Sequence, residues 1–153
     1  MKKPIIAFFA VVMMVCAVSG CDKQSHNGDL DGMWQFMEVN YHVGEEDSTV
    51  DLKDGKAYLS FQLDLAQIKW LNMDLDSTTS TIVMRFSHSG DLLTFYDFYR
   101  HYRTSDSLFT ASDSMLLAPL GFKGGECVFD VITLTSDAME LESDFAGITF
   151  RKF

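Results

Sequence analysis

The feature that most constrains the fold of this chain is an alternation of apolar and polar side chains with a period of two residues. The pattern occurs at 59–65, 81–87, 139–142 and 148–151. Successive side chains of a β-strand point to opposite faces of the sheet, so this period predicts strands with one buried face. Clusters of Gly, Asp, Asn and Ser separate the runs. Such turn residues favour short connections, and the sequence therefore predicts an antiparallel meander.

The number of predicted strands limits the architecture. Further strands are expected at 33–43, 66–73, 92–99 and 126–135, which brings the total to about eight to ten. An open sheet of that size would expose apolar surface and free edges, so the strands must close into a barrel or stack as a sandwich. We expect an all-β domain, an antiparallel barrel of eight to ten strands. The segment 104–123 breaks the alternation and is expected to form a helical turn or a loop across one barrel end.

The N-terminal residues predict export. Residues 1–20 begin with Lys2 and Lys3, continue with an uncharged apolar run and end in small residues, which is the layout of a secretory signal. The run is shorter than the roughly 20 apolar residues of a transmembrane helix. The sequence Val18-Ser19-Gly20-Cys21 resembles the bacterial lipobox, whose cysteine receives lipid and becomes the mature N-terminus. The resemblance implies a membrane anchor at Cys21; a cleaved signal with a coincidental cysteine is the alternative.

Cleavage before Cys21 would change the charge and the cysteine count. Loss of the signal with its two lysines would take the net charge from −10 to −12, which disfavours nucleic acid and anionic lipid surfaces as partners. Cys127 would then have no disulfide partner, and we expect it to be a small buried side chain, with a reactive thiol as the alternative. Residues 21–29 are polar and aperiodic, so they are predicted to tether a domain at 30–153.

Both ends of that domain resemble a known family. The sequence Leu-Asp-Gly-Met-Trp at 30–34 resembles the Gly-x-Trp motif that opens the first strand of lipocalins and related calycins, and 147–153 resembles their last strand. Together with the lipobox, the layout is similar to the small lipocalin-like lipoproteins that are frequent in Bacteroidetes. The resemblance implies that Gly32 allows a tight turn into the first strand and that Trp34 plugs one barrel end, leaving the other end as the mouth.

The family resemblance also implies a basic residue packed over the tryptophan ring. Arg151 and Lys152 are the two candidates in this chain. Alternation from Phe150 favours Lys152 as the inward cation, whereas the family often uses an arginine. A cation over an indole face contributes about 0.5 to 2 kcal/mol.

The segment 95–103 (FYDFYRHYR) combines aromatic rings with cations and is the main candidate for ligand binding. Strict alternation would place on one face Tyr96, Phe98, Arg100 and Tyr102. The other face would carry Phe95, Asp97, Tyr99, His101 and Arg103. Rings beside a guanidinium at the barrel mouth suit an amphipathic ligand with an acidic group. The ligand-binding candidates are therefore Tyr96, Phe98, Tyr99, Arg100, Tyr102 and Arg103; the alternative is aromatic core packing with arginines that reach solvent.

Other chemistry is not indicated by the sequence. Alternating oxygen ligands at 72–77 suggest a calcium loop, but the required glycine and the bidentate glutamate are missing. The four histidines lack metal-ligand spacing, and no nucleophile elbow or phosphate-binding loop is present. We therefore predict no catalytic residue, cofactor or metal, and no enzyme activity.

These observations predict a membrane-anchored envelope lipoprotein whose lipocalin-like barrel binds a small apolar or amphipathic ligand in its interior. The alternative is a ligand-free structural or protein-interaction lipoprotein. Large side chains at the expected inward positions count against a roomy cavity, because an eight-stranded barrel is only just wide enough to be filled by them. If the source is Gram-negative, as the resemblance implies, the expected location is the outer membrane, on its periplasmic or its surface-facing side.

Overall fold

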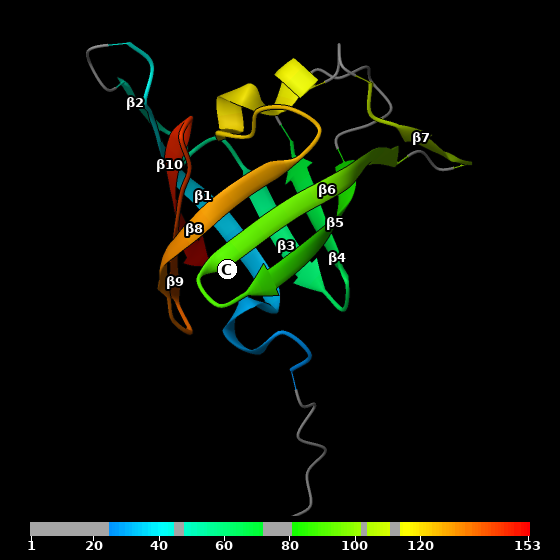
Figure 1. Cartoon of the computed structure of the whole chain (residues 1–153), viewed down its shortest axis with the longest axis horizontal. Helices are drawn as coiled ribbons and strands as arrows, with labels where there is room; N and C mark the ends of the chain where they lie inside the picture. Colours follow the sequence, from blue (N-terminus) through cyan, green and yellow to red (C-terminus); the bar gives the residue numbers. More distant parts are fainter. Residues whose placement is uncertain (1–24, 45–47, 72–80, 102–103, 111–113) are drawn as a thin grey trace, which may run out of the picture.

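The computed structural model describes residues 25–44, 48–71, 81–101, 104–110 and 114–153. Their elements, in chain order, are η1 (Gly28–Leu30), β1 (Gly32–Tyr41), β2 (Ser48–Asp51), β3 (Ala57–Gln62), β4 (Leu65–Trp70), β5 (Thr81–Ser89), β6 (Leu92–His101), β7 (Asp106–Leu108), η2 (Ser114–Leu120), β8 (Cys127–Leu134), β9 (Ala138–Glu142) and β10 (Ala146–Lys152), where η is a 3-10 helix (Figure 1). Within these residues, no helix has the length and apolar character needed to cross a bilayer.

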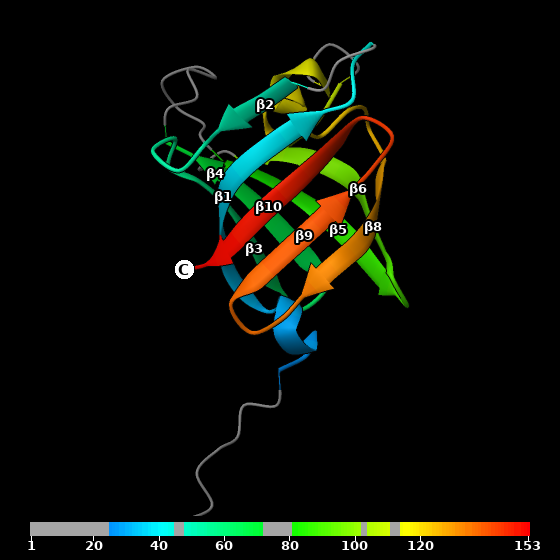
Figure 2. The same cartoon turned by 90° about the vertical axis from the view of Figure 1, so that its left-hand side faces the viewer.

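Eight strands close into an antiparallel barrel. The pairing runs β1-β3-β4-β5-β6-β8-β9-β10, and β10 pairs back onto β1 from Trp34↔Lys152 to Tyr41↔Ala146 (Figure 2). β2 lies beside the second half of β1, and β7 pairs with the end of β6. The prediction of an all-β antiparallel barrel is therefore confirmed. Closure removes the free edges that an open sheet of this size would expose.

The sequence pattern was misleading at the β3–β4 hairpin. The alternation at 59–65 predicted one strand, but the chain reverses at Leu63 and Asp64, and Gln62 pairs with Leu65. Leu63 adopts a left-handed conformation with φ of 55° and is 61% exposed, so it is not an inward residue. The turn lacks the Asn-Gly or Asp-Gly dipeptide that marks most two-residue hairpins, which explains why the period alone did not reveal it.

A β-bulge in β6 overturns the face assignment made from strict alternation. Val83 of β5 pairs with Tyr99 and Arg85 pairs with Tyr96, so the single residue between them on β5 faces two residues on β6. One of these two, Asp97, has a φ of 53°. The extra residue shifts the alternation by one position, as bulges do. Phe98 therefore points inward together with Phe95, rather than to the opposite face.

The barrel interior is filled by aromatic side chains. Phe122, which follows η2, inserts its ring among Phe36, Phe95 and Phe129, with ring centroids 6.3, 5.3 and 5.2 Å away. Phe36 also packs on Phe150 at 4.6 Å. All five rings are buried. The space that the sequence suggested for a ligand is thus occupied by the chain itself.

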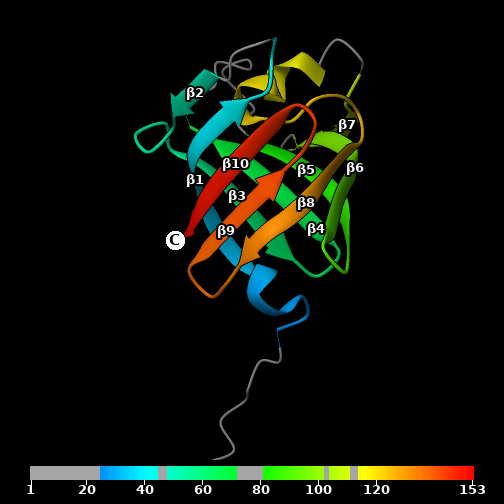
Figure 3. The ribbon, with the colours of Figure 1, turned by 60° about the vertical axis from the view of Figure 1, so that its left-hand side comes forward.

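The two barrel ends are built differently (Figure 3). At one end η1 buries Leu30, and at the other η2 lies across the strands and buries Leu117 and Leu120. The break in alternation at 104–123 thus corresponds to β7 and a 3-10 helix at a barrel end. Residues 25–29, expected in the tether, belong to the folded η1 end: Asn27 Nδ2 donates to Asp31 Oδ1 at 2.6 Å and Ser25 Oγ donates to Asp31 Oδ2 at 2.7 Å.

Candidate functional site

Trp34 and Lys152 close the η1 end of the barrel. The Lys152 ammonium lies 4.1 Å from the Trp34 ring centroid and donates hydrogen bonds to the backbone oxygens of Asp29 at 2.7 Å and Asp31 at 2.5 Å. The indole Nε1 donates to Leu30 O at 2.8 Å. Burial lowers the pKa of Lys152, while the nearby Asp29 and Asp31 act in the opposite direction. Charge-assisted hydrogen bonds and the ring face together compensate the ammonium for lost water.

Gly32 and Arg151, the other two residues of the predicted closing motif, have distinct positions. Gly32 has a φ of 111°, and a Cβ there would lie 3.1 Å from Lys152 Cε, so glycine serves both the turn and the close approach of the lysine. Arg151 points away from the tryptophan, and its Nη2 donates to Oε1 of the buried Gln35 at 2.8 Å. Gln35 Nε2 in turn donates to Lys53 O at 2.8 Å, which ties the segment after β2 to the barrel wall.

The predicted ligand-binding residues do not gather on one face. Phe98 is buried in the core, and Arg100 pairs with the inward Ile82, its guanidinium 5.9 Å from the Phe109 ring. Tyr96 and Tyr99 pair with the outward face of β5. Tyr102 and Arg103 lie outside the described residues. Among the candidates that are described, the bulge has separated the tyrosine rings from the arginine.

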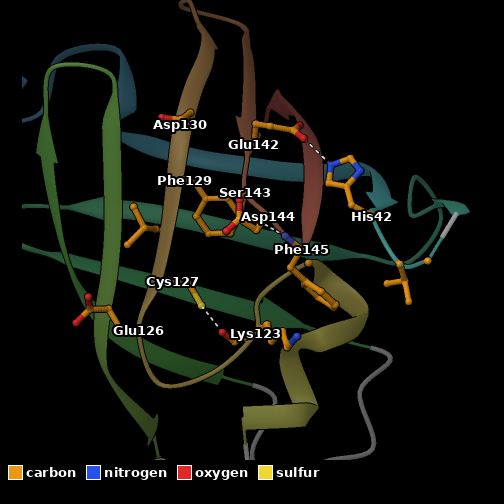
Figure 4. A pocket seen from close by; sticks show the side chains of 14 residues that line it. His42, Lys123, Glu126, Cys127, Phe129, Asp130, Glu142, Ser143, Asp144 and Phe145 are labelled. Carbon is orange, nitrogen blue, oxygen red and sulfur yellow. Dashed lines mark hydrogen bonds and ion pairs between the residues drawn. The ribbon is translucent and has the colours of Figure 1, made fainter. Parts of the chain in front are cut away.

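A different site occurs at the η2 end. An open groove of about 1070 Å³ lies between β8 and the turn that joins β9 to β10 (Figure 4). The pairing of β8 with β9 begins at Asp130↔Glu142, so residues 127–129 have the turn 143–145, and no strand, beside their β9-side edge, while their other edge pairs with β6. The buried side chains of Cys127 and Phe129 line the groove together with exposed charged residues. The groove therefore reaches from solvent to the edge of the core.

Three side-chain contacts and one backbone hydrogen bond shape the groove wall. His42 Nε2 lies 2.5 Å from Glu142 Oε1, and the His42 backbone N–H donates to Phe145 O at 3.0 Å. The Lys123 ammonium lies 5.3 Å from the Phe145 ring centroid, and the Tyr41 ring packs against the same ring at 5.6 Å. Phe145 thus joins the end of β1 to the segment between η2 and β8.

Cys127 is a structural residue of this wall. Its Sγ lies 3.5 Å from Lys123 O, and burial raises the pKa of the thiol to about 11. The nucleophile is the thiolate, so a thiol with this pKa is almost entirely protonated and inert at neutral pH. This agrees with the expectation of a small buried side chain.

No metal centre is found in the part of the chain that the structure describes. His26 and His88 line a smaller hollow at the η1 end, where His26 Nε2 lies 3.4 Å from Asp64 Oδ1. The described histidines, cysteine and acids nevertheless form no group of three with the placement that a metal needs. The calcium-loop-like residues at 72–77 lie outside the described residues.

The groove could not be read from the sequence. His42, Lys123 and Phe145 belong to three segments that meet only after the barrel closes. The turn residues at 144–147 and the glycines at 124–125 are the available signals, and they indicate loops rather than a shared site. Only the combination of loops at one barrel end, which depends on the strand order, brings these side chains together.

Comparison with known proteins identifies the class. The family described as a lipocalin-like domain matches residues 13–153, and the chain belongs to this family. A crystal structure of a lipocalin-like protein from Bacteroides uniformis is 24% identical, with a TM-score of 0.57, and the match covers 82% of this chain and all of that chain. An uncharacterized protein from Bacteroides eggerthii is 19% identical, with a TM-score of 0.52, over 81% of this chain and 99% of that chain. No protein of curated function matches.

Proposed function

We propose that this lipocalin-like protein is an envelope lipoprotein, anchored through Cys21, that binds a small amphipathic ligand in the groove at the η2 end of its barrel. The observation that carries the proposal is the contrast between the filled interior and the open groove of about 1070 Å³. Pockets for small molecules are usually about 300 to 1,000 Å³ and combine apolar walls with a few polar groups. The proposal assigns no catalytic reaction to the chain.

The position of the groove suits a tethered protein. Ser25, hydrogen-bonded to Asp31, lies at the η1 end, and the groove lies at the opposite end. Four chain steps separate Cys21 from Ser25, and they span at most about 14 Å. Lipid on Cys21 would hold the η1 end close to the bilayer and leave the groove facing the aqueous phase. Outer-membrane location, periplasmic or surface-facing, remains part of the proposal.

Two measurements test the proposal. The first compares membrane partition of the chain with that of Cys21→Ser, which we expect to move to the soluble fraction. The second is native mass spectrometry of the Cys21→Ser chain purified under mild conditions, which we expect to retain a small ligand. Val128→Trp, which adds bulk in the groove, should release that ligand. Ile132→Trp is the matched control, since Ile132 is an exposed residue of the same strand that does not line the groove.

Several results would count against this function. Unchanged membrane partition of Cys21→Ser would end the anchoring part. The ligand-binding part would be refuted if the purified chain carried no small molecule and if no amphiphile raised its melting temperature. A ligand that binds only the folded state must stabilise that state.

A second candidate function rests on an adjoining surface of the barrel wall, which shares Val128 with the groove. Leu92 of β6 pairs with Asp130 of β8, so Leu92 lies diagonally between the outward-facing Val128 and Ile132, and all three apolar side chains are exposed. Such a patch on the barrel wall favours a protein-interaction role. Under that function, Ile132→Asp would weaken cross-linking to an envelope protein in intact cells, while ligand retention would not change.

A further inference from the structure

We propose that the groove selects amphiphiles with a positively charged head, and that the ammonium group of the ligand lies on the Phe145 ring in place of the Lys123 ammonium. This inference rests on the proposed ligand-binding function of the groove and adds the chemical class of the ligand. It reverses the expectation from the arginines of 95–103, which pointed to an acidic ligand.

The proposed cation seat is the face of the Phe145 ring, and in the structure a cation already lies near it. The Lys123 ammonium lies 5.3 Å from the Phe145 ring centroid, within the distance at which a cation is attracted to an aromatic face. Phe145 is half-buried and held in place by the Tyr41 ring and by the hydrogen bond from His42 N to its carbonyl. Lys123 itself is exposed. Its flexible side chain can leave the ring for water, so a ligand cation can replace it.

The charges around the groove favour a cationic head. The described ionisable groups that line it are Lys123, Glu126, Asp130, Asp144 and the His42–Glu142 pair, with Cys127 protonated. Three of the acids, Glu126, Asp130 and Asp144, are exposed. Four carboxylates therefore line the groove against two basic side chains, His42 and Lys123. A carboxylate head would be repelled there, and an ammonium head attracted.

The apolar part of the ligand has a place in the same groove. Val43, which follows β1, is 62% exposed, and Val128 of β8 is 48% exposed. The two valines come from segments on either side of the Phe145 turn. An alkyl chain that contacts them would remove both from water while its head stays at the ring, which is the arrangement of an amphiphile with one charged end.

The test uses two probes with the same tail and opposite heads, decyltrimethylammonium and decanoate. Both are titrated by calorimetry, below their micelle concentrations, into the Cys21→Ser chain, which lacks the lipid and retains every described residue. We expect the cation to bind at least about tenfold more tightly than decanoate. Phe145→Leu, which keeps an apolar side chain and removes the ring, should lower the affinity for decyltrimethylammonium by about 2- to 30-fold. Lys123→Met, which removes the competing ammonium, should raise that affinity.

A charge control separates the groove from the overall negative charge. Asp144→Asn should lower the affinity for decyltrimethylammonium several-fold, and Asp64→Asn at the η1 end should leave that affinity unchanged. If Phe145→Leu lowers the melting temperature strongly, Lys123→Met and Asp144→Asn still decide the question, because both change exposed side chains.

Each outcome has one meaning. Equal or tighter binding of decanoate overturns the cation selectivity and leaves the groove as a binding site. Cation binding that is insensitive to Phe145, Lys123 and Asp144 overturns the proposed seat. Failure of both probes, with no small molecule retained by the purified chain, overturns the proposed function together with this inference.

Discussion

Replacement of Phe122 by alanine is the sharpest test of the packed barrel. The side chain is 1% exposed and comes from the segment after η2, not from a strand. Its ring lies 6.3 Å from Phe36, 5.3 Å from Phe95 and 5.2 Å from Phe129. Removal of a buried phenylalanine ring costs about 3 to 5 kcal/mol, because apolar burial is lost and a cavity remains. Three ring contacts place Phe122→Ala toward the upper part of that range.

Urea unfolding followed by circular dichroism measures the effect. With a slope of about 1 to 3 kcal/mol per molar urea for small proteins, the midpoint should fall by roughly 2 M. Phe153→Ala is the matched control, since Phe153 is 71% exposed and its ring has an edge contact with Tyr58 at 5.2 Å, so the free energy of unfolding should fall by no more than about 1.5 kcal/mol. Benzene should partly restore the stability of Phe122→Ala, because an apolar cavity binds apolar molecules. A loss below about 1 kcal/mol, or no response to benzene, would show that Phe122 does not fill the barrel.

Three further predictions concern other contacts. Gly121→Ala should destabilise the fold by at least about 2 kcal/mol in thermal unfolding, because Gly121 has a φ of 83° and a Cβ would lie 2.8 Å from the buried Ile148 side chain; a neutral result would contradict this geometry. Lys152→Met should lower the free energy of unfolding by about 1 to 2 kcal/mol and shift the fluorescence of Trp34, and an unchanged spectrum would argue against the ring contact. Cys127 should resist thiol reagents at pH 8 until urea unfolds the chain. Burial raises the pKa of Cys127 from an ordinary 9.0 to about 11, so above pH 9 the unfolded state releases a proton that the folded state keeps, and stability should fall as the pH rises from 9 to 11. Cys127→Ala should reduce this fall without abolishing it, because burial also raises the pKa of Tyr41.

The closing motif shows how far local sequence reasoning reached. Strand alternation at the C-terminus favoured Lys152 over Arg151 as the cation at Trp34, although the family resemblance left both open, and Lys152 is the residue that lies over the ring. Alternation was informative here because Trp34 and Lys152 pair directly across β1 and β10. In β6 the same reasoning failed at Asp97, because a bulge depends on how two strands accommodate each other's length and twist, which one strand does not encode.

The candidate site was beyond sequence reasoning for a related physical reason. Each groove residue is an ordinary loop or strand-end residue in its own segment. Phe145 becomes a possible cation seat only because the β9–β10 turn lies beside both Lys123 and the end of β1. That neighbourhood follows from the closure of β10 on β1, which involves residues about a hundred positions apart.

The sequence by itself determined the strand-rich class and the antiparallel meander, because the two-residue period and the turn residues are local properties. Only the tertiary structure decided that the interior is full and that open space lies at the rim. The position of Phe122 in the interior, and the gap between β8 and the β9–β10 turn, depend on how side chains from distant segments pack together inside the closed barrel. Such close packing is a property of the whole barrel and not of any one segment.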